Sequence, residues 1–419
     1  MSLHHFVADA NWSDEQMLLR VCPWVVPKMN FSGGGWWIID DTGFPKQGRH
    51  SAAVARQYCS MLGKQDNYQL AVNVSLASRT AGIPVAWHLY LPREWADDPA
   101  RRDKAGIPEA RQFATKPAIA LQQIEHLLDQ GAPRHCVLAD AGYGVDTAFH
   151  ARLTELGLRY CVGVTGSVTV WPPGRGPLPP PPTYGGRGRR VVKLGTRLRL
   201  GGSALPQHHP HSIKAIALEL GPKHWRPVTW RQGTNTKLRS RFARVRVRAA
   251  HRDSLRDEVR EPEWLLIEWP KGDAEPLKYW LSTLPEDAPL KRMVYEAKMR
   301  WRIERDYQDL KQDLGLGHYE GRGWRGFHHH ASLSIAAYGF LLAQRLRHPD
   351  EIGGKKNSAQ RQEPALPAHY KPRGSPASAA PRPIFNHQFA NAYRRTPGPK
   401  PSTMPLLFST VFREQLLTQ

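Results

Sequence analysis

Three acidic residues stand where the chain could present carboxylates at one place. Asp41 ends an apolar run rich in β-forming residues, GWWIIDD over 35–41, and a turn signature follows it. Asp140 ends a second apolar run, and Glu304 lies in a segment with helical periodicity. Hard divalent cations prefer carboxylate oxygens, and two such cations can activate an attacking oxygen and stabilise a leaving one in phosphoryl transfer. Asp41, Asp140 and Glu304 are therefore candidate catalytic and metal-binding residues.

Asp40 competes with Asp41 for the first of these positions. Side chains alternate between the two faces of a strand, so only one of the two neighbours can point into a site. Each acid alone is weak evidence, because strand-end aspartates commonly cap turns and helical glutamates are usually solvated. We select Asp41, which stands at the end of the run, and the structure must decide between the two.

Two cations flank Glu304 on its helix. Arg300 lies four residues before it and Lys311 seven after, which places all three on one helical face. The arrangement is either an ordinary ladder of intrahelical ion pairs or a set of cations that grip phosphates beside a carboxylate.

The charge of the whole chain favours nucleic acid as a partner. The 59 Lys and Arg residues outnumber the 37 Asp and Glu residues, which gives a net charge of +22 and a pI of about 10.1. Such an excess attracts polyanions before any specific contact forms, although a general basic bias is the alternative. Scattered cysteines, and the lack of a signal pattern or a long apolar stretch, predict a cytoplasmic protein with no membrane partner.

The first part of the chain predicts alternating strands and helices. A helix over about 117–128 has a start signal at Thr115 and a stop at Gly131. Short apolar runs predict strands at 35–41, 68–76, 83–91, 135–139 and 158–164, and a second helix is expected over about 147–156. We expect an α/β core in which the strand ends carrying Asp41 and Asp140 meet.

The composition of the sequence changes beyond Gly166. Pro/Gly-rich sequence and short runs of alternating apolar and polar residues predict a mainly antiparallel β insertion over about 166–285. Within 242–248, apolar residues alternate with Arg244, Arg246 and Arg248, which places three guanidinium groups on one face of a strand. DNA contact and a solvated face explain this pattern equally well.

Helical periodicity returns from Leu290 past Glu304 and again over about 328–345. The predicted domains are a helical N-terminal segment at 1–34, a core in two parts at 35–165 and 286–347, a β insertion at 166–285, and a disordered basic tail at 348–419.

The motifs around the acids resemble those of bacterial insertion-sequence transposases of the cut-and-paste DDE type that carry a β-strand insertion. The resemblance covers about 3–345 and depends on the helix RWRIE over 300–304 with its lysine at 311, on DDT over 40–42, on LAD over 138–140, and on TGFPKQG over 42–48 and YEGRGW over 319–324. It implies an RNase H-like catalytic core in which Asp41, Asp140 and Glu304 hold Mg²⁺, with Mn²⁺ as the alternative ion.

The resemblance also implies partners and further site residues. It implies double-stranded DNA as the partner, both as terminal inverted repeats and as target, a homodimer on that DNA, and association with the nucleoid. Trp280 lies near where such enzymes stack an aromatic ring on a flipped base, although a buried core tryptophan is at least as good a reading. Lys46, Arg49 and Arg56 follow the first strand closely and are candidate phosphate contacts, although basic loop residues are more often merely solvated.

Two departures from the family pattern matter. The tyrosine expected three residues before Arg300 is replaced by Ala297, so Tyr295 is its nearest substitute. The segment 1–34 resembles only the end of the family's N-terminal DNA-recognition domain, which suggests a truncated or misannotated start. Two rival functions therefore stay open at this point, a non-catalytic DNA-binding repressor or remnant and a metal-dependent nuclease without strand transfer.

Overall fold

The computed structural model of the chain describes residues 3–59, 64–178, 193–194, 199–200, 203–204, 209–233 and 236–348. The chain divides into two compact units, of which the first comprises Met1–Ala343 and Arg361–Gly374. The elements below belong to this first unit, apart from the last residues of the final helix. The expectation for the tail falls on residues that, from 349 onward, lie outside the described part.

The fold is mixed α/β and is built around one large, mostly antiparallel sheet. The strands of its first part are β1 (Trp36–Pro45), β2 (Ala55–Cys59), β3 (Lys64–Ala77), β4 (Gly82–Leu89), β5 (Cys136–Ala139) and β6 (Tyr160–Val164). β1 pairs antiparallel with β3, which in turn pairs with β2 and β4, whereas β5 runs parallel to both β1 and β6. The spatial order is therefore β4, β3, β1, β5, β6.

The same sheet continues through strands from the second part of the chain, because β14 pairs antiparallel with β6. These strands are β7 (Thr169–Trp171), β10 (His211–Ser212), β11 (Arg226–Gln232), β12 (Lys237–Ala249), β13 (Glu263–Glu268) and β14 (Lys278–Ser282). β8 (Arg199–Leu200) and β9 (Ser203–Ala204) form a separate pair. Short helical segments interrupt this part: α8 (Ile213–Glu219), η2 (Pro222–His224) and η3 (Asp253–Leu255).

The remaining helices occur before, between and after the strands of the first part. They are α1 (Leu3–Ala8), α2 (Asp14–Val25), η1 (Val26–Lys28), α3 (Arg93–Ala96), α4 (Pro99–Ala105), α5 (Lys116–Asp129), α6 (Ala141–Gly144), α7 (Thr147–Glu155), α9 (Leu290–Lys298), α10 (Trp301–Gln312), η4 (Leu316–His318) and α11 (Trp324–Arg347). No helix among the described residues is long and apolar enough to cross a membrane.

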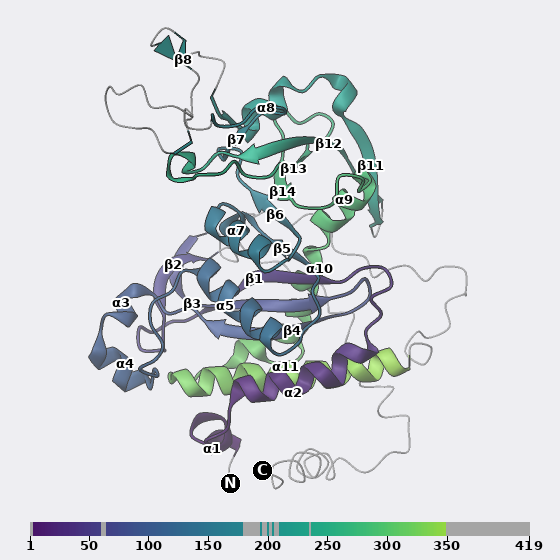
Figure 1. Cartoon of the computed structure of the whole chain (residues 1–419). Coiled ribbons are helices and arrows are strands. Elements are labelled where there is room, and N and C mark those ends of the chain that lie inside the picture. The colour runs from purple at the N-terminus through teal and green to yellow at the C-terminus, as the bar shows by residue number, and fades with distance from the viewer. Residues whose placement is uncertain are drawn as a thin grey trace. The chain divides into compact units, whose positions relative to one another are not determined.

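Helices cover both faces of the sheet at β1 (Figure 1). α5 lies on one face, where Gln123 donates a hydrogen bond to the Val72 carbonyl of β3 at 3.0 Å. α9 lies on the opposite face, where the buried Glu296 accepts a hydrogen bond from the Trp36 indole. α11 shares this second face, since Phe327 packs edge-on against Phe44 with ring centroids 5.4 Å apart.

Most predicted elements of the first part are confirmed, because their signals are local. β1 contains the GWWIIDD run from Trp36 onward, and the chain from Trp36 to Ile39 is almost fully buried. Thr115 caps α5 by accepting from the Ala118 amide at 3.3 Å, and Gly131 follows the helix with a φ of +78°, a conformation that favours glycine.

The expected single helix from Leu290 past Glu304 is wrong in one respect. The chain forms two helices, α9 and α10, joined at Met299 and Arg300. The Met299, Arg302 and Ile303 amides bond the carbonyls three residues earlier instead of four. This tightened turn places Arg300 immediately before the first turn of α10.

Candidate active site

β1 and β5 bring two aspartates side by side. The strands run parallel with Trp36 opposite Cys136 and Ile38 opposite Leu138. Continuing the same register by two residues places Asp40 opposite Asp140, and residues paired in this way point to the same face of the sheet. Asp140 also caps α6, where its carboxylate accepts from the Gly142 amide at 2.9 Å, so its orientation is fixed.

Arg300 lies among the carboxylates of this face. Its guanidinium group forms an ion pair with Asp40 at 2.8 Å and lies 3.9 Å from Glu304, one turn along α10. Asp40 and Arg300 are about three-quarters buried, whereas the Glu304 side chain is 61% exposed. Glu304 therefore stands at the open side of the cluster, where a substrate could reach it.

The electrostatics show that three carboxylates act on this one arginine. Burial would lower the pKa of Arg300, but Asp40, Asp140 and Glu304 together raise it above its ordinary value. Burial raises the pKa of Asp40 to about 6; Arg300 opposes that shift, and the like charges of Asp140 and Asp41 add to it. We call Asp40, Asp140 and Glu304, the three carboxylates that raise the pKa of Arg300, the acidic cluster.

Asp41 lies on the other face of β1. Its carboxylate forms a 2.6 Å ion pair with Lys116 at the start of α5 and accepts a hydrogen bond from the Tyr143 hydroxyl of α6. Burial and the nearby Asp41 carboxylate raise the pKa of Tyr143. The geometry therefore favours Asp40 over Asp41, which the sequence analysis selected, as the partner of Asp140 and Glu304.

The donor set of the cluster suits a hard divalent cation, because it consists of carboxylate oxygens that repel one another. In the arrangement described, the guanidinium group of Arg300 supplies the balancing positive charge. Within the described ranges, no group of three or more His, Cys, Asp or Glu side chains is already arranged to hold a metal ion.

Lys311 and Lys46, two of the predicted phosphate contacts, bond to backbone carbonyls of the protein. Lys311 donates to the Gly43 carbonyl of β1 at 2.9 Å, and its ammonium group lies 5.1 Å from the centre of the Phe44 ring. Lys46 donates to the Tyr319 carbonyl, and burial lowers its pKa. Lys311 thus ties α10 to β1, and Lys46, just after β1, is tied to the segment that follows α10; both lysines stay partly accessible.

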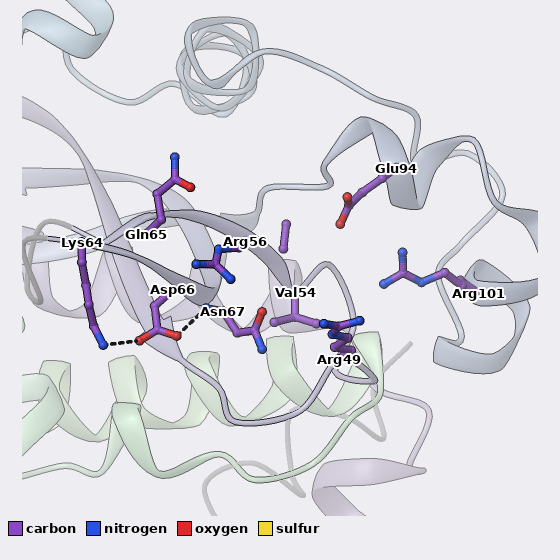
Figure 2. A pocket seen from close by; sticks show the side chains of 10 residues that line it. Arg49, Val54, Arg56, Lys64, Gln65, Asp66, Asn67, Glu94 and Arg101 are labelled. Carbon is purple, nitrogen blue, oxygen red and sulfur yellow. Dashed lines mark hydrogen bonds and ion pairs between the residues drawn. The ribbon is translucent and has the colours of Figure 1, made fainter.

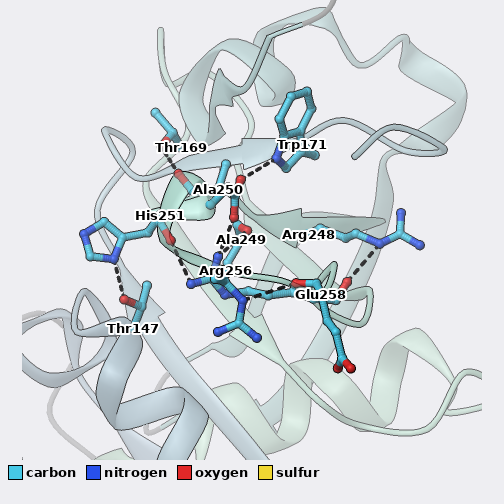
Figure 3. A network of polar contacts seen from close by, with 11 residues as sticks. Thr147, Thr169, Trp171, Arg248, Ala249, Ala250, His251, Arg256 and Glu258 are labelled. Carbon is cyan, nitrogen blue, oxygen red and sulfur yellow. Dashed lines mark hydrogen bonds and ion pairs between the residues drawn. The ribbon is translucent and has the colours of Figure 1, made fainter. Parts of the chain in front are cut away.

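The arginines of β12 follow the predicted alternation, with Val245 and Val247 buried between them. Arg244 and Arg246 stack on the Trp264 ring, at 4.4 and 5.0 Å from its centre. Arg248 donates to the Arg260 carbonyl at 3.0 Å, in the polar network that Figure 3 shows around Trp171 and His251. Arg244 and Arg246 therefore join β12 to β13, and Arg248 joins β12 to the segment before β13.

Trp280 lies in the core, with 7% of its surface exposed. The ammonium group of Lys298, itself paired with the buried Glu268 at 2.6 Å, lies 5.3 Å from the centre of its ring. Tyr295 packs against Trp36 with ring centroids 5.8 Å apart. Neither aromatic ring lies on an open surface beside the acidic cluster.

Arg49 is exposed and lines a cleft together with Arg56, Lys64 and Arg101 (Figure 2). The sequence analysis did not select Arg101, and no local pattern marks it, because it joins the others only through the packing of α3 and α4. Lys116 and Tyr143 were missed for a similar reason, since their link to Asp41 spans 75 and 102 residues.

The fold is mixed α/β, and at the candidate site Arg300 pairs with Asp40 and lies 3.9 Å from Glu304. The model of the DDE superfamily endonuclease family matches residues 1–237, which is more than half of the chain. The chain therefore belongs to the DDE superfamily endonuclease family, whose enzymes generally use divalent metal ions. The matched region contains Asp40 and Asp140, and Glu304 lies beyond it.

A curated relative points in the same direction. The chain is 32% identical over 173 residues to a protein of Microchaete diplosiphon described as a probable transposase for insertion sequence element IS701. The similarity covers 39% of this chain and 40% of the relative, so it spans about two fifths of that protein's length.

Proposed function

We propose that the chain is a DNA transposase that cuts DNA at the ends of an insertion sequence and joins the freed ends to target DNA. Its family membership and its similarity to the probable transposase support the class of activity. The observation that carries the proposal is that Arg300 pairs with Asp40 at 2.8 Å and lies 3.9 Å from Glu304, at the strand end where Asp140 follows β5 in register with Asp40. Carboxylates can hold the metal ions of two-metal phosphoryl transfer, and a neighbouring arginine can face a phosphate.

The catalytic roles follow from these positions. Asp40, Asp140 and Glu304 would hold Mg²⁺, with Mn²⁺ as the alternative, and the bound ions supply activation of the attacking oxygen and stabilisation of the leaving oxygen. Arg300 would leave its ion pair with Asp40 and contact a phosphate next to the scissile bond. Lys311, on the same face of α10, would contact the next phosphate after releasing the Gly43 carbonyl.

The strand order supports an RNase H-like core as the scaffold of this site. Three antiparallel strands, β4, β3 and β1, are followed by the parallel β5 and β6, which is the arrangement that the family resemblance implies. On this proposal 35–165 and 286–347 form the core, 166–285 forms the inserted β region, and the helices of 1–34 derive from a DNA-recognition domain. Paired element ends bound by a homodimer in the nucleoid complete the proposed assembly.

The test is an assay of cutting and joining with the full chain. Labelled DNA from the flanks of its gene and scrambled DNA of the same length are incubated with a supercoiled target and Mg²⁺, Mn²⁺ or EDTA. The proposal predicts nicks at one position of the flanking DNA and joined products, both dependent on the metal ion. Asp140→Asn serves as the inactive control.

Two outcomes would contradict the proposal in different ways. Cutting without joined products would indicate a metal-dependent nuclease of the same superfamily. Binding without any cutting, in a chain that is folded by circular dichroism, would indicate a DNA-binding repressor. Cutting that persists in Asp140→Asn would show that the acidic cluster is not the active site.

A further inference from the structure

A basic cleft lies between the β2–β3 hairpin and the helices α3 and α4 (Figure 2). Its volume is about 550 Å³. Four cationic side chains, Arg49, Arg56, Lys64 and Arg101, line it together with two acids, Asp66 and Glu94. The cations outnumber the acids by two; three of them lie within residues 49–64, and Arg101 comes from α4.

Most of the cations have no acidic partner in the part of the chain that the structure describes. Lys64 lies 3.4 Å from Asp66, but Arg49, Arg56 and Arg101 form no ion pair there within 4 Å. The guanidinium carbon of Arg101 lies over the Trp95 ring, 3.9 Å from its centre, so the ring holds this side chain in place. Arg56 acts on Asp66 electrostatically without an ion pair, so three guanidinium groups are free of an ion pair among the described residues.

The floor of the cleft is rigid. Residues 51–54 are buried, and Ala53 has a φ of +60°, which only a well-supported backbone retains. Trp95 donates to the Val54 carbonyl at 2.7 Å, and Gln69 donates to the Ala52 carbonyl at 2.6 Å. The indole N–H of Trp95 thus supports the floor, and the face of its ring holds Arg101 before a ligand arrives.

We propose that this cleft binds the phosphodiester backbone of double-stranded DNA at a place separate from the acidic cluster. Guanidinium groups present forks of N–H donors that match phosphate oxygens, and contacts of this kind position DNA without reading its sequence. The inference rests on the proposed function for the identity of the DNA, since a transposase must hold its substrate on both sides of the cut.

The register of β3 sets the distance between the two places. Asn73 lies opposite Asp40 on β1, and Asn67, in the cleft, lies six residues away along β3. Six residues of a strand span about 20 Å. A duplex rises about 3.4 Å per base pair, so DNA passing both places would meet the cleft roughly six base pairs from the acidic cluster.

The test compares two double variants that remove equal charge. Arg49→Gln with Arg56→Gln empties the cleft of two exposed guanidinium groups and leaves Arg101 on Trp95. Lys223→Gln with Lys271→Gln removes two exposed cations from η2 and from the turn between β13 and β14 and is the matched control. Affinity for a 30-base-pair duplex is measured from low to moderate salt in EDTA, where no cutting occurs, and thermal unfolding confirms that all variants are folded.

The plot of log affinity against log salt should be less steep for the cleft variant than for the wild type by about 2 in slope, because each of the two lost phosphate contacts contributes about 0.9. The control variant should keep the slope of the wild-type chain. Equal slopes in the two double variants would overturn the proposal. The proposal would also be overturned if inorganic phosphate bound to the wild-type chain and not to the cleft variant while both bound the duplex equally. That result would indicate a site for small anions.

The outcome is independent of whether the chain cuts DNA. If the chain does not cut DNA but the cleft variant shows a reduced salt slope, the DNA-binding cleft is supported and the transposase proposal is contradicted. If the chain cuts and joins DNA but the cleft variant has the same salt slope as the control variant, the transposase proposal is supported and the DNA-binding role of the cleft is contradicted.

Discussion

Glu263 couples the stability of the protein to pH. It lies on β13, 7% exposed, and accepts a hydrogen bond from the Tyr160 hydroxyl of β6 at 2.9 Å. Burial raises the pKa of Glu263 from 4.5 to about 7, against the opposing effects of that hydrogen bond and of Arg260 and Arg246. The folded protein therefore holds a proton on Glu263 that the unfolded chain releases at a lower pH.

The sign and the size of the effect follow from linkage. An acid whose pKa is raised by folding stabilises the protein below its unfolded pKa, and this stabilisation is lost as the pH rises through the folded pKa. With pKa values of 4.5 and about 7, the loss between pH 5 and pH 8 is roughly 2.5 kcal/mol. Glu263→Gln removes the titration and keeps an oxygen that can accept from Tyr160.

The assay is urea unfolding of the wild-type chain and of Glu263→Gln at pH 5, 6.5 and 8. The stability of the variant relative to the wild type should rise by roughly 2.5 kcal/mol over this range. Burial lowers the pKa of the neighbouring His150 to about 4, but His150 contributes equally to both proteins and so cancels in the difference. Glu261→Gln, an exposed acid two residues away, is the matched control. Parallel pH profiles for the wild type and Glu263→Gln would refute the reasoning.

Two further predictions concern the buried contacts around β14. Lys298→Met should destabilise the protein by about 3–5 kcal/mol in urea unfolding, because it leaves the carboxylate of Glu268, 4% exposed, without its partner. Adding Glu268→Gln should recover part of this loss of stability. An unchanged urea midpoint for Lys298→Met alone would contradict the assignment. Trp280→Ala should cost about 3–5 kcal/mol and Trp280→Phe much less, since Trp280 is a core residue. Full stability of Trp280→Ala together with loss of DNA cutting would instead support the base-stacking role that the family resemblance implies.

The sequence predicts elements whose signals are local. The apolar run of β1, the Thr115 cap of α5 and the turn at Gly131 all act within a few residues, and each element occurs where it is predicted. The turn between α9 and α10 has no such signal, because Met299 and Arg300 keep helical dihedral angles and only the hydrogen-bond spacing changes.

The site could be predicted only in part, for a physical reason. Strand alternation correctly separates Asp40 from Asp41, but the face that meets α10 depends on the packing of helices more than 250 residues later in the chain. The same reason applies to the arginines of β12. Alternation places Arg244 and Arg246 on one face, whereas their stacking depends on Trp264 of the neighbouring strand.

The central claim is that Asp40, Asp140 and Glu304 form the catalytic centre and that Asp41 is held on the opposite face by Lys116. The most direct test measures Mg²⁺-dependent cutting of DNA by Asp40→Asn and Asp41→Asn side by side, with folding checked by circular dichroism. Loss of a metal ligand removes several kcal/mol of transition-state stabilisation, so Asp40→Asn should be slower by on the order of 1,000-fold. Asp41→Asn should stay within about tenfold of the wild type, which corresponds to less than about 1.4 kcal/mol. The reverse order, with Asp41→Asn inactive and Asp40→Asn active, would contradict the account.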